Sequence, residues 1–188
     1  MASDVTAVWE ESELWAGQEG LPPPFWAFCW PGGQALARWV LDSPSELAGR
    51  HVLDFGSGCG LVAIAAARSG ACQVTAVDID PLAAAAMELN AGVNGVFFEI
   101  LEEDLIGRPA SWDVVLAADV LYEKRLAEPL LDWLKSLVCQ GVLVVISDPG
   151  RAYLPTLGLR RLATYTVPTS LDLEDARQRE TSIYALEA

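Results

Sequence analysis

Apolar residues along this chain occur in short continuous runs, and most of these runs are followed by stretches in which apolar residues recur at helical spacing. A continuous apolar run bounded by turn residues is typical of a buried parallel strand, whereas recurrence every three or four residues is typical of a helix. The predicted strands span residues 51–55, 73–77, 96–100, 114–118 and 142–146. The predicted helices span residues 34–41, 61–69, 81–90 and about 126–138, with Pro129 in the first turn of the last.

The pattern changes after Arg151. Residues 162–167 and 181–186 have the composition of strands, and a polar stretch, residues 170–179, separates them without a long helix. Two such strands predict an antiparallel hairpin at the edge of a sheet. Strands that alternate with helices and end in a hairpin predict an α/β fold with a doubly wound sheet.

The first 33 residues differ from the rest of the chain. Tryptophans 9 and 15 lie among acidic residues before the prolines 22–24, which predicts a short helical or irregular lead-in whose aromatics pack onto the domain. Residues 24–33 then hold many aromatic side chains and end in Pro31 and two glycines. This segment is either a packed turn or one wall of a ligand site, with Trp30 placed directly before a helix.

Composition limits the class of protein. A chain of 188 residues with 52% apolar residues is predicted to form one domain, residues 1–188, with a lead-in over 1–33, a core over 34–151 and the hairpin over 152–188. Its apolar runs have the length of strands, and none approaches the roughly 20 residues of a membrane-spanning helix. No membrane association is predicted.

Charge and cysteine content narrow the partners. The formal charge of −14 argues against a nucleic-acid partner, and it either favours a basic partner or keeps an apolar protein soluble. The four cysteines form no C-x-x-C pair and only one histidine is present, so they are predicted to be buried thiols in a reducing compartment, with neither a disulfide framework nor a metal site. The N-terminus shows no basic region followed by an apolar stretch, which predicts a cytoplasmic protein.

A glycine-rich turn follows the first predicted strand. Gly56, Gly58 and Gly60 alternate with other residues, Asp54 precedes them, and a predicted helix begins at Leu61. A dinucleotide site would have a third glycine at position 61, and Asp54 would repel a pyrophosphate but would suit a ligand that carries an amino group. The turn therefore resembles the first motif of class I S-adenosylmethionine-dependent methyltransferases.

Acidic residues end the next two strands. Asp78 lies 22 residues after Gly56, near the interval at which a carboxylate binds ribose hydroxyls in such folds, while Asp80 is placed to cap the next helix. Asp104 follows the third predicted strand. Its carboxylate would either accept a hydrogen bond from an adenine amino group or lie in a solvated turn.

Several segments in one order resemble a narrower family. These are residues 24–33 (PFWAFCWPGG), 54–60 (DFGSGCG), 78–81 (DIDP), 112–113 (WD), 119–122 (DVLY) and 148–151 (DPGR). Their order, from about Trp9 to Arg151, is similar to that of the seven-β-strand protein-lysine methyltransferases, and within them to bacterial-type members of the electron transfer flavoprotein β-subunit lysine methyltransferase family. The tail after Arg151 matches only loosely.

This resemblance implies a fold, a cofactor and a substrate. The fold would be Rossmann-like, with a seven-stranded sheet that is mostly parallel and has an antiparallel C-terminal strand. The cofactor would be S-adenosyl-L-methionine, with S-adenosyl-L-homocysteine as its product, and the substrate would be a protein with exposed lysines, the electron transfer flavoprotein β subunit. Because no basic, Ser-rich extension precedes the motifs, a bacterial-type cytoplasmic member is expected.

The resemblance also assigns roles to residues. Gly56, Ser57 and Gly58 would approach the methionine part of the cofactor. The remaining cofactor residues would be Asp78 with Ile79 near the ribose, Asp104 near the adenine, Trp30 and Ala118 along the pocket wall, and Asp54 and Gly60 of the glycine motif. Asp119 and Tyr122 would receive the lysine as catalytic residues.

Each role has an alternative. Asp119 would hold the incoming lysine ammonium and Tyr122 would orient it, but Asp119 could instead cap a helix. Asp148 and Arg151 would shape the substrate entrance or, as favoured here, form a turn with a surface ion pair. A small-molecule amine methyltransferase and a non-catalytic cofactor-binding module remain open, and Leu61 together with Asp54 disfavours a dinucleotide oxidoreductase.

Overall fold

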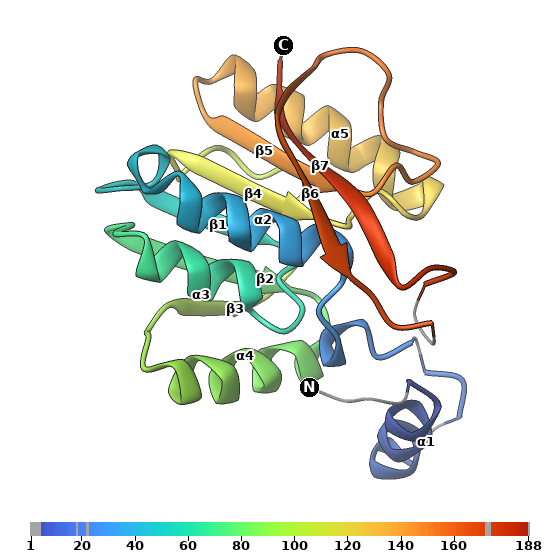
Figure 1. Ribbon diagram of the computed structural model, residues 1–188. Helices are drawn as coiled ribbons and strands as arrows, with labels where there is room; N and C mark the ends of the chain where they lie inside the picture. Colours follow the sequence, from blue (N-terminus) through green and yellow to red (C-terminus); the bar gives the residue numbers. More distant parts are fainter. Residues whose placement is uncertain (1–4, 18, 22, 172–173, 188) are drawn as a thin grey trace.

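In the computed structural model, which describes residues 5–17, 19–21, 23–171 and 174–187, one seven-stranded sheet with helices on both faces forms the centre of the molecule (Figure 1). The strands are β1 (His51–Phe55), β2 (Gln73–Asp78), β3 (Glu99–Glu102), β4 (Val114–Ala118), β5 (Leu143–Asp148), β6 (Leu159–Pro168) and β7 (Gln178–Leu186). Their order is β3-β2-β1-β4-β5-β7-β6. The pairs among β1 to β5 are parallel, and β7 runs antiparallel to both β5 and β6, so the predicted sheet and its terminal hairpin are confirmed.

The helices cover the two faces unequally. The described helices are α1 (Val5–Ala16), α2 (Pro31–Asp42), α3 (Leu61–Arg68), α4 (Pro81–Asn94) and α5 (Lys124–Cys139), with the short 3-10 turns η1 (Phe25–Ala27) and η2 (Pro44–Glu46). Figure 1 shows α2, α3 and α4 side by side on one face and α5 on the other. Among the described residues, α5 is the one helix on its face, which leaves part of that face to loops.

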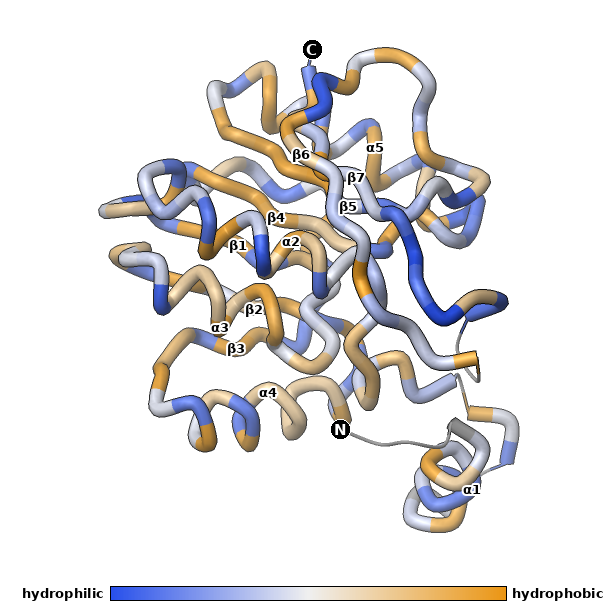
Figure 2. The backbone as a smooth tube through the Cα atoms, in the orientation of Figure 1, coloured by the Kyte–Doolittle hydropathy of each residue, from blue (hydrophilic) through white to orange (hydrophobic). Residues whose placement is uncertain are grey.

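Alternating side chains of the central strands fill two cores. Val52 belongs to the cluster that includes α2, α3 and α4, whereas Leu53 belongs to the cluster under α5. Figure 2 shows the hydrophobic residues concentrated in these central strands, as expected for parallel strands that are buried on both faces. Because both cores are apolar, polar side chains are left to gather at the strand ends.

The third strand lies later in the chain than predicted. The prediction placed it at residues 96–100, but β3 spans Glu99–Glu102. The preceding residues end the helix instead: Gly95 adopts a left-handed conformation, and the N–H of Val96 donates back to the carbonyl of Ala91 at 3.1 Å. Phe98 is buried against α4 rather than paired in the sheet, since its ring lies 3.4 Å from where a Cβ on Gly60 would be.

Several helices are longer than predicted. The second helix begins at Pro31 rather than at residue 34, so the predicted domain boundary after residue 33 falls inside α2. The fourth continues to Asn94, and the fifth begins at Lys124, which places Pro129 in the helix interior rather than in its first turn. Helix ends depend on capping contacts as much as on apolar spacing, which explains these differences.

The N-terminal helix does not pack as predicted. Figure 1 shows α1 away from the sheet, and the side chain of Trp15 is exposed. The helix is held instead to the segment that follows it, because the Trp9 indole N–H donates to the carbonyl of Leu21 at 3.0 Å and the Glu13 carboxylate accepts from the N–H of Gly20. Trp9 therefore contacts its own connection rather than the core.

The cysteines differ in exposure, contrary to the prediction of four buried thiols. Cys59 is buried and Cys29 is partly buried, whereas Cys72 and Cys139 are exposed. Both exposed residues lie at ends of elements, where little packs over them. Within the described ranges, no helix is both long enough and apolar enough to cross a membrane.

Candidate active site

The strand order creates a switch point between β1 and β4. From β1 the chain moves outward through β2 to β3, and it then returns to place β4 on the other side of β1. Ligands of open α/β sheets bind at such a point, outside the carboxyl ends of the strands. Here those ends are Phe55, which precedes the glycine turn, and Ala118, which precedes Asp119.

A pocket lies at this switch point, between the aromatic segment, the glycine turn and the end of β4. Seven predicted site residues line it: Trp30, Asp54, Gly56, Ser57, Gly58, Ala118 and Asp119. The lining also includes Phe25, Phe28, Cys29, Cys59, Leu61 and Val62, which were not predicted as site residues. The fold therefore brings together segments that are about 60 residues apart along the chain.

Backbone geometry explains the first two glycines of the turn. Gly56 and Gly58 have φ angles of 66° and 53°, which side chains disfavour. A Cβ on Gly56 would also lie 2.9 Å from a methyl group of Val120, the second residue after β4. The N–H of Gly58 donates to the carboxylate of Asp78 at 2.9 Å, so the turn is tied to the end of β2.

The third glycine has a different role from the one predicted. Gly60 precedes α3 with a φ of 80°, and a Cβ there would meet the side chain of Met87 in α4 at 3.1 Å. Gly60 does not line the pocket. The structure therefore places it at the contact between α3 and α4, where the lack of a side chain permits close packing, and not against the ligand.

Asp54 holds the turn from below. Its side chain is 2% exposed and accepts hydrogen bonds from the Ser57 hydroxyl and, at 2.9 Å, from the N–H of Ala63 in α3. Burial raises the pKa of Asp54 to about 6, although both hydrogen bonds act in the opposite direction. The contacts seen here link strand, turn and helix, and the predicted role toward a ligand amino group stays a prediction.

The acids after β2 divide as predicted. Both oxygens of Asp78 are engaged, with the N–H of Gly58 and, at 3.1 Å, with the N–H of Asp80. Burial raises the pKa of Asp78. Asp80 caps α4 by accepting from the N–H of Leu82 at 2.8 Å, which confirms that prediction. Asp78 and Ile79 stand at the carboxyl edge without lining the pocket, so their ribose role stays a prediction.

Asp104 lies outside the pocket. It is exposed, and its carboxylate accepts from the N–H of Ile106 at 3.0 Å, which closes a local turn after β3. This contact matches the solvated turn rather than a ligand contact. Its predicted role near an adenine stays a prediction.

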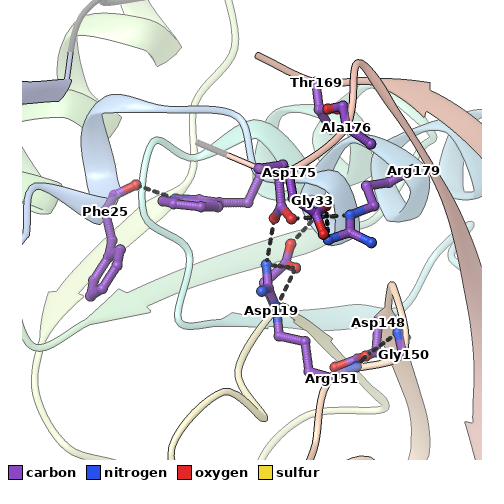
Figure 3. A network of polar contacts seen from close by, with 12 residues as sticks. Phe25, Gly33, Asp119, Asp148, Gly150, Arg151, Thr169, Asp175, Ala176 and Arg179 are labelled. Carbon is purple, nitrogen blue, oxygen red and sulfur yellow. Dashed lines mark hydrogen bonds and ion pairs between the residues drawn. The ribbon is translucent and has the colours of Figure 1, made fainter. Parts of the chain in front are cut away.

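Asp119 has strained backbone geometry at the edge of the pocket. Its φ of 56° is positive, and it is the one residue other than glycine with such an angle in the described part of the chain. Such angles cost energy and occur often at functional sites. One carboxylate oxygen accepts from the N–H of Gly33 in α2 at 3.1 Å, and the other accepts from Arg151 at 3.1 Å (Figure 3). Asp119 thus satisfies the first turn of α2, which is not the helix that follows it.

The charge of Asp119 is balanced between burial and a cation. Burial raises the pKa of Asp119 to about 6, while the guanidinium of Arg151 and the N–H of Gly33 oppose the rise. At neutral pH the side chain is therefore a carboxylate, but a costly one to leave without a cation. This chemistry suits a group that receives an ammonium.

Arg151 contacts the site, contrary to the favoured prediction of a surface ion pair. Its guanidinium is mostly buried and joins Asp119 to Glu174, which accepts at 3.1 Å from the connection between β6 and β7. Glu174 also accepts from Arg179 at 3.1 Å. Asp148 does form the predicted turn, because its carboxylate accepts from the N–H groups of Gly150 and Arg151 (Figure 3).

An aromatic cluster borders the pocket. The ring of Phe25 lies 5.7 Å from that of Trp30 and 5.5 Å from that of Tyr122, centroid to centroid. The indole N–H of Trp30 donates to the carbonyl of Phe25 at 2.9 Å. Tyr122 is 46% exposed and reaches the pocket only through Phe25, a residue whose role only the aromatic composition of its segment could have suggested.

A second, wider hollow lies at the opposite edge of the sheet. His51, Gln73 and Glu99, the first residues of three parallel strands, line it. None of the predicted site residues lies there. It marks the part of the α5 face that no described helix covers, and because ligands of such sheets bind at the carboxyl ends, it is not the candidate active site. No group of three His, Cys, Asp or Glu side chains in the described ranges is arranged to hold a metal ion.

Comparison with solved structures supports the fold. The ribosomal protein L11 methylase from Lactobacillus delbrueckii subsp. bulgaricus matches with a TM-score of 0.57 and 21% identity over 86% of this chain and 81% of that one. Magnesium protoporphyrin IX methyltransferase from Synechocystis PCC 6803 matches with a TM-score of 0.59 and 17% identity over 82% of this chain and 78% of that one. At these identities the likeness concerns the fold.

Comparison by sequence identifies the family. The electron transfer flavoprotein β subunit lysine methyltransferase of Danio rerio is 42% identical over 88% of this chain and 66% of its own length, and that of Homo sapiens is 40% identical over 93% and 66%. This chain thus spans about two thirds of the length of these relatives. The sequence model of the lysine methyltransferase family matches residues 10–151. Since that match covers most of the chain, the protein belongs to the lysine methyltransferase family.

Proposed function

We propose that this protein transfers a methyl group from S-adenosyl-L-methionine to lysine ε-amino groups of a protein, and that this protein is the β subunit of electron transfer flavoprotein. One observation carries the proposal: the buried carboxylate of Asp119 and the glycine turn after β1 line one pocket at the switch point of the sheet. The relatives of about 40% identity, which are named for that substrate, support the choice of acceptor.

The residues of the pocket suit this cofactor. Gly56 and Gly58 present main chain without side chains, and the N-terminus of α3 follows directly. Trp30 supplies an apolar wall, and the Asp78 carboxylate stands beside the turn. When bound, the cofactor would supply a methyl group activated by a sulfonium. A solved methyltransferase of the same fold holds S-adenosylmethionine, which agrees with this assignment.

Asp119 would position the lysine. A lysine side chain has a pKa near 10.4, so it arrives at neutral pH as an ammonium, and only its neutral form has the lone pair that accepts a methyl group. The Asp119 carboxylate would bind the ammonium and hold the nitrogen in place, with Tyr122 at the rim. A carboxyl with a pKa of about 6 is too weak a base to take up most of the protons from such an amine. Asp119 is therefore proposed as a positioning group, and the proton leaves to solvent.

Arg151 adds a condition to this model. Its guanidinium already pairs with Asp119, so an incoming ammonium would share or displace that contact. Since the second oxygen of Asp119 is bound to the N–H of Gly33, the carboxylate keeps its orientation while the cation changes. The acidic surface, with a formal charge of −14, would further favour a basic segment around the target lysine. A cytoplasmic location stays a prediction.

A labelling experiment tests the proposal. The protein is incubated with S-adenosylmethionine labelled in its methyl group and with recombinant electron transfer flavoprotein, and the subunits are separated. Label is expected on the β subunit and absent when its lysines have been acetylated beforehand. Label on other proteins only would retain the chemistry and reject the substrate, and label on small amines only would favour the small-molecule alternative. Cofactor binding without any transfer would favour the non-catalytic alternative.

A further inference from the structure

Two cysteines lie together in the pocket. The Sγ atoms of Cys29 and Cys59 are 3.8 Å apart, although the residues are separated by 30 positions in the chain. Cys29 belongs to the aromatic segment before α2, and Cys59 belongs to the glycine turn before α3. Both line the pocket, so a small reagent that enters the pocket can reach them.

The surroundings of Cys59 favour its thiolate. A hydrogen bond from the Cys29 thiol lowers the pKa of Cys59, and the N–H of Leu61 at the start of α3 acts in the same direction, against burial and the nearby charge of Asp54. Thiols at helix N-termini are activated in this way. The same hydrogen bond, together with burial, raises the pKa of Cys29, which therefore keeps its proton and acts as the donor.

We propose that Cys29 and Cys59 are a reversible disulfide site, which a hydroperoxide closes and a dithiol reopens. The Cys59 thiolate attacks one peroxide oxygen, which breaks the O–O bond, forms a sulfenic acid on Cys59 and releases hydroxide. The Cys29 thiol then attacks the Cys59 sulfur, forms the S–S bond and releases water, with its proton going to the leaving oxygen. Two thiols are oxidised, and one peroxide is reduced to two waters in total.

Closing the disulfide would reshape the pocket. The two sulfurs must approach from 3.8 Å to about 2.05 Å. Cys59 is held in place, because its carbonyl accepts from the Asn90 side chain at 2.8 Å and the residue is buried. The movement would therefore fall on Cys29 and the adjoining Trp30, and it would draw the aromatic wall toward the glycine turn. If this pocket holds the cofactor, as the proposed function states, oxidation would weaken cofactor binding.

Mass spectrometry tests the disulfide independently of any activity. The full chain is treated with hydrogen peroxide, alkylated and digested without reductant. A peptide that joins Cys29 to Cys59 is expected, it should disappear after treatment with dithiothreitol, and it should not form in the Cys29→Ser variant. The matched control is the double variant Cys72→Ser, Cys139→Ser, which lacks only the exposed thiols and should form the same link. Reduced or irreversibly oxidised Cys29 and Cys59 in the treated protein would overturn the proposal.

A titration tests the consequence. S-adenosylhomocysteine is titrated calorimetrically into reduced and oxidised samples of the Cys72→Ser, Cys139→Ser variant. Affinity is expected to fall about tenfold or more on oxidation and to return with dithiothreitol, and bound ligand should slow formation of the disulfide. Equal affinity in both samples would overturn the effect on the pocket. Absence of binding to the reduced protein, with the disulfide still formed, would count against the proposed function and not against the site.

Discussion

At the scale of single residues, Asp119 combines three unfavourable features. Its φ is positive, its carboxylate is buried, and that burial raises its pKa to about 6. The fold tolerates them because the N–H of Gly33 and the guanidinium of Arg151 both bind the carboxylate. A residue that costs stability in this way is expected to contribute to activity.

Replacement of Asp119 by asparagine tests this expectation. Asparagine tolerates a positive φ and keeps an oxygen for Gly33, so the fold should persist, but the charge that receives an ammonium is lost. We expect methyl transfer to fall by about 100-fold or more, while the affinity for S-adenosylhomocysteine changes little. Asp132→Asn, on the exposed side of α5, is the matched control and should retain transfer. Loss of cofactor affinity in Asp119→Asn would instead place this residue in the cofactor site.

Two neighbouring glycines offer a sharper structural test. A Cβ on Gly32 would lie 2.7 Å from Cγ of Asp119 and 2.9 Å from the carbonyl oxygen of Ser147, whereas a Cβ on Gly33 would meet nothing within 4 Å. Gly32→Ala should therefore lower the free energy of unfolding by about 1–3 kcal/mol and reduce transfer. Gly33→Ala should leave stability unchanged or slightly higher, because alanine favours helices. Urea denaturation of the two variants measures this, and equal effects would mean that Asp119 is not packed against α2 as described.

At the scale of elements, the connection between β6 and β7 reaches the end of β4. Glu174 in this connection binds Arg151, and Arg151 binds Asp119. Figure 2 shows strongly hydrophilic residues just before β7, in contrast to the apolar central strands. The hairpin therefore supports the site through charge, although it adds no residue to the lining of the pocket.

Substitution of Glu174 measures this support. Glu174→Gln removes the charge between Arg151 and Arg179 and should cost about 1–3 kcal/mol, less than a fully buried pair because both arginines are partly exposed. It should also raise the KM for the protein substrate more than it changes the affinity for the cofactor. Asp175→Asn is the matched control, since Asp175 pairs with the same Arg179 but is exposed, and it should have little effect. Similar changes in both variants would argue against a specific role of Glu174.

Sequence patterns predicted the elements better than the contacts between them. β4 was predicted at its observed bounds because an apolar run between turn residues is sufficient to define a central strand. β3 was misplaced because the apolar residues before it pack under α4. The pairing of Asp119 with Arg151 and Glu174 was not predicted, since it depends on the side-by-side position of β5 and β7, which no local pattern encodes. Cys29 and Cys59 were likewise too far apart in the sequence to be paired.

At the scale of the whole molecule, buried carboxyl groups at the carboxyl edge of the sheet control the response to pH. Burial raises the pKa of Asp54 and Asp119 to about 6 and also raises the pKa of Asp78 and Asp148. The folded state therefore binds more protons than the unfolded state between the ordinary pKa of these acids and about 6. The free energy of unfolding should fall as pH rises through this window, and the formal charge of −14 acts in the same direction.

Denaturation at two pH values tests this prediction. The urea midpoint, followed by tryptophan fluorescence at low protein concentration, should be higher at about pH 5 than at about pH 7. Asp54→Asn should reduce the difference, because it removes one of the groups whose pKa is raised to about 6. A midpoint that increases from about pH 5 to about pH 7 would contradict the assigned direction.

The most direct test of the proposed function follows the methyl group to its acceptor atom. The protein, S-adenosylmethionine with a deuterated methyl group and recombinant electron transfer flavoprotein are combined, and the β subunit is digested and sequenced by tandem mass spectrometry. The predicted result is a deuterated methyl group on a lysine ε-nitrogen, strongly reduced with Asp119→Asn. Intact lysines throughout the acceptor, or a deuterated methyl group on another type of residue, would contradict the proposed function.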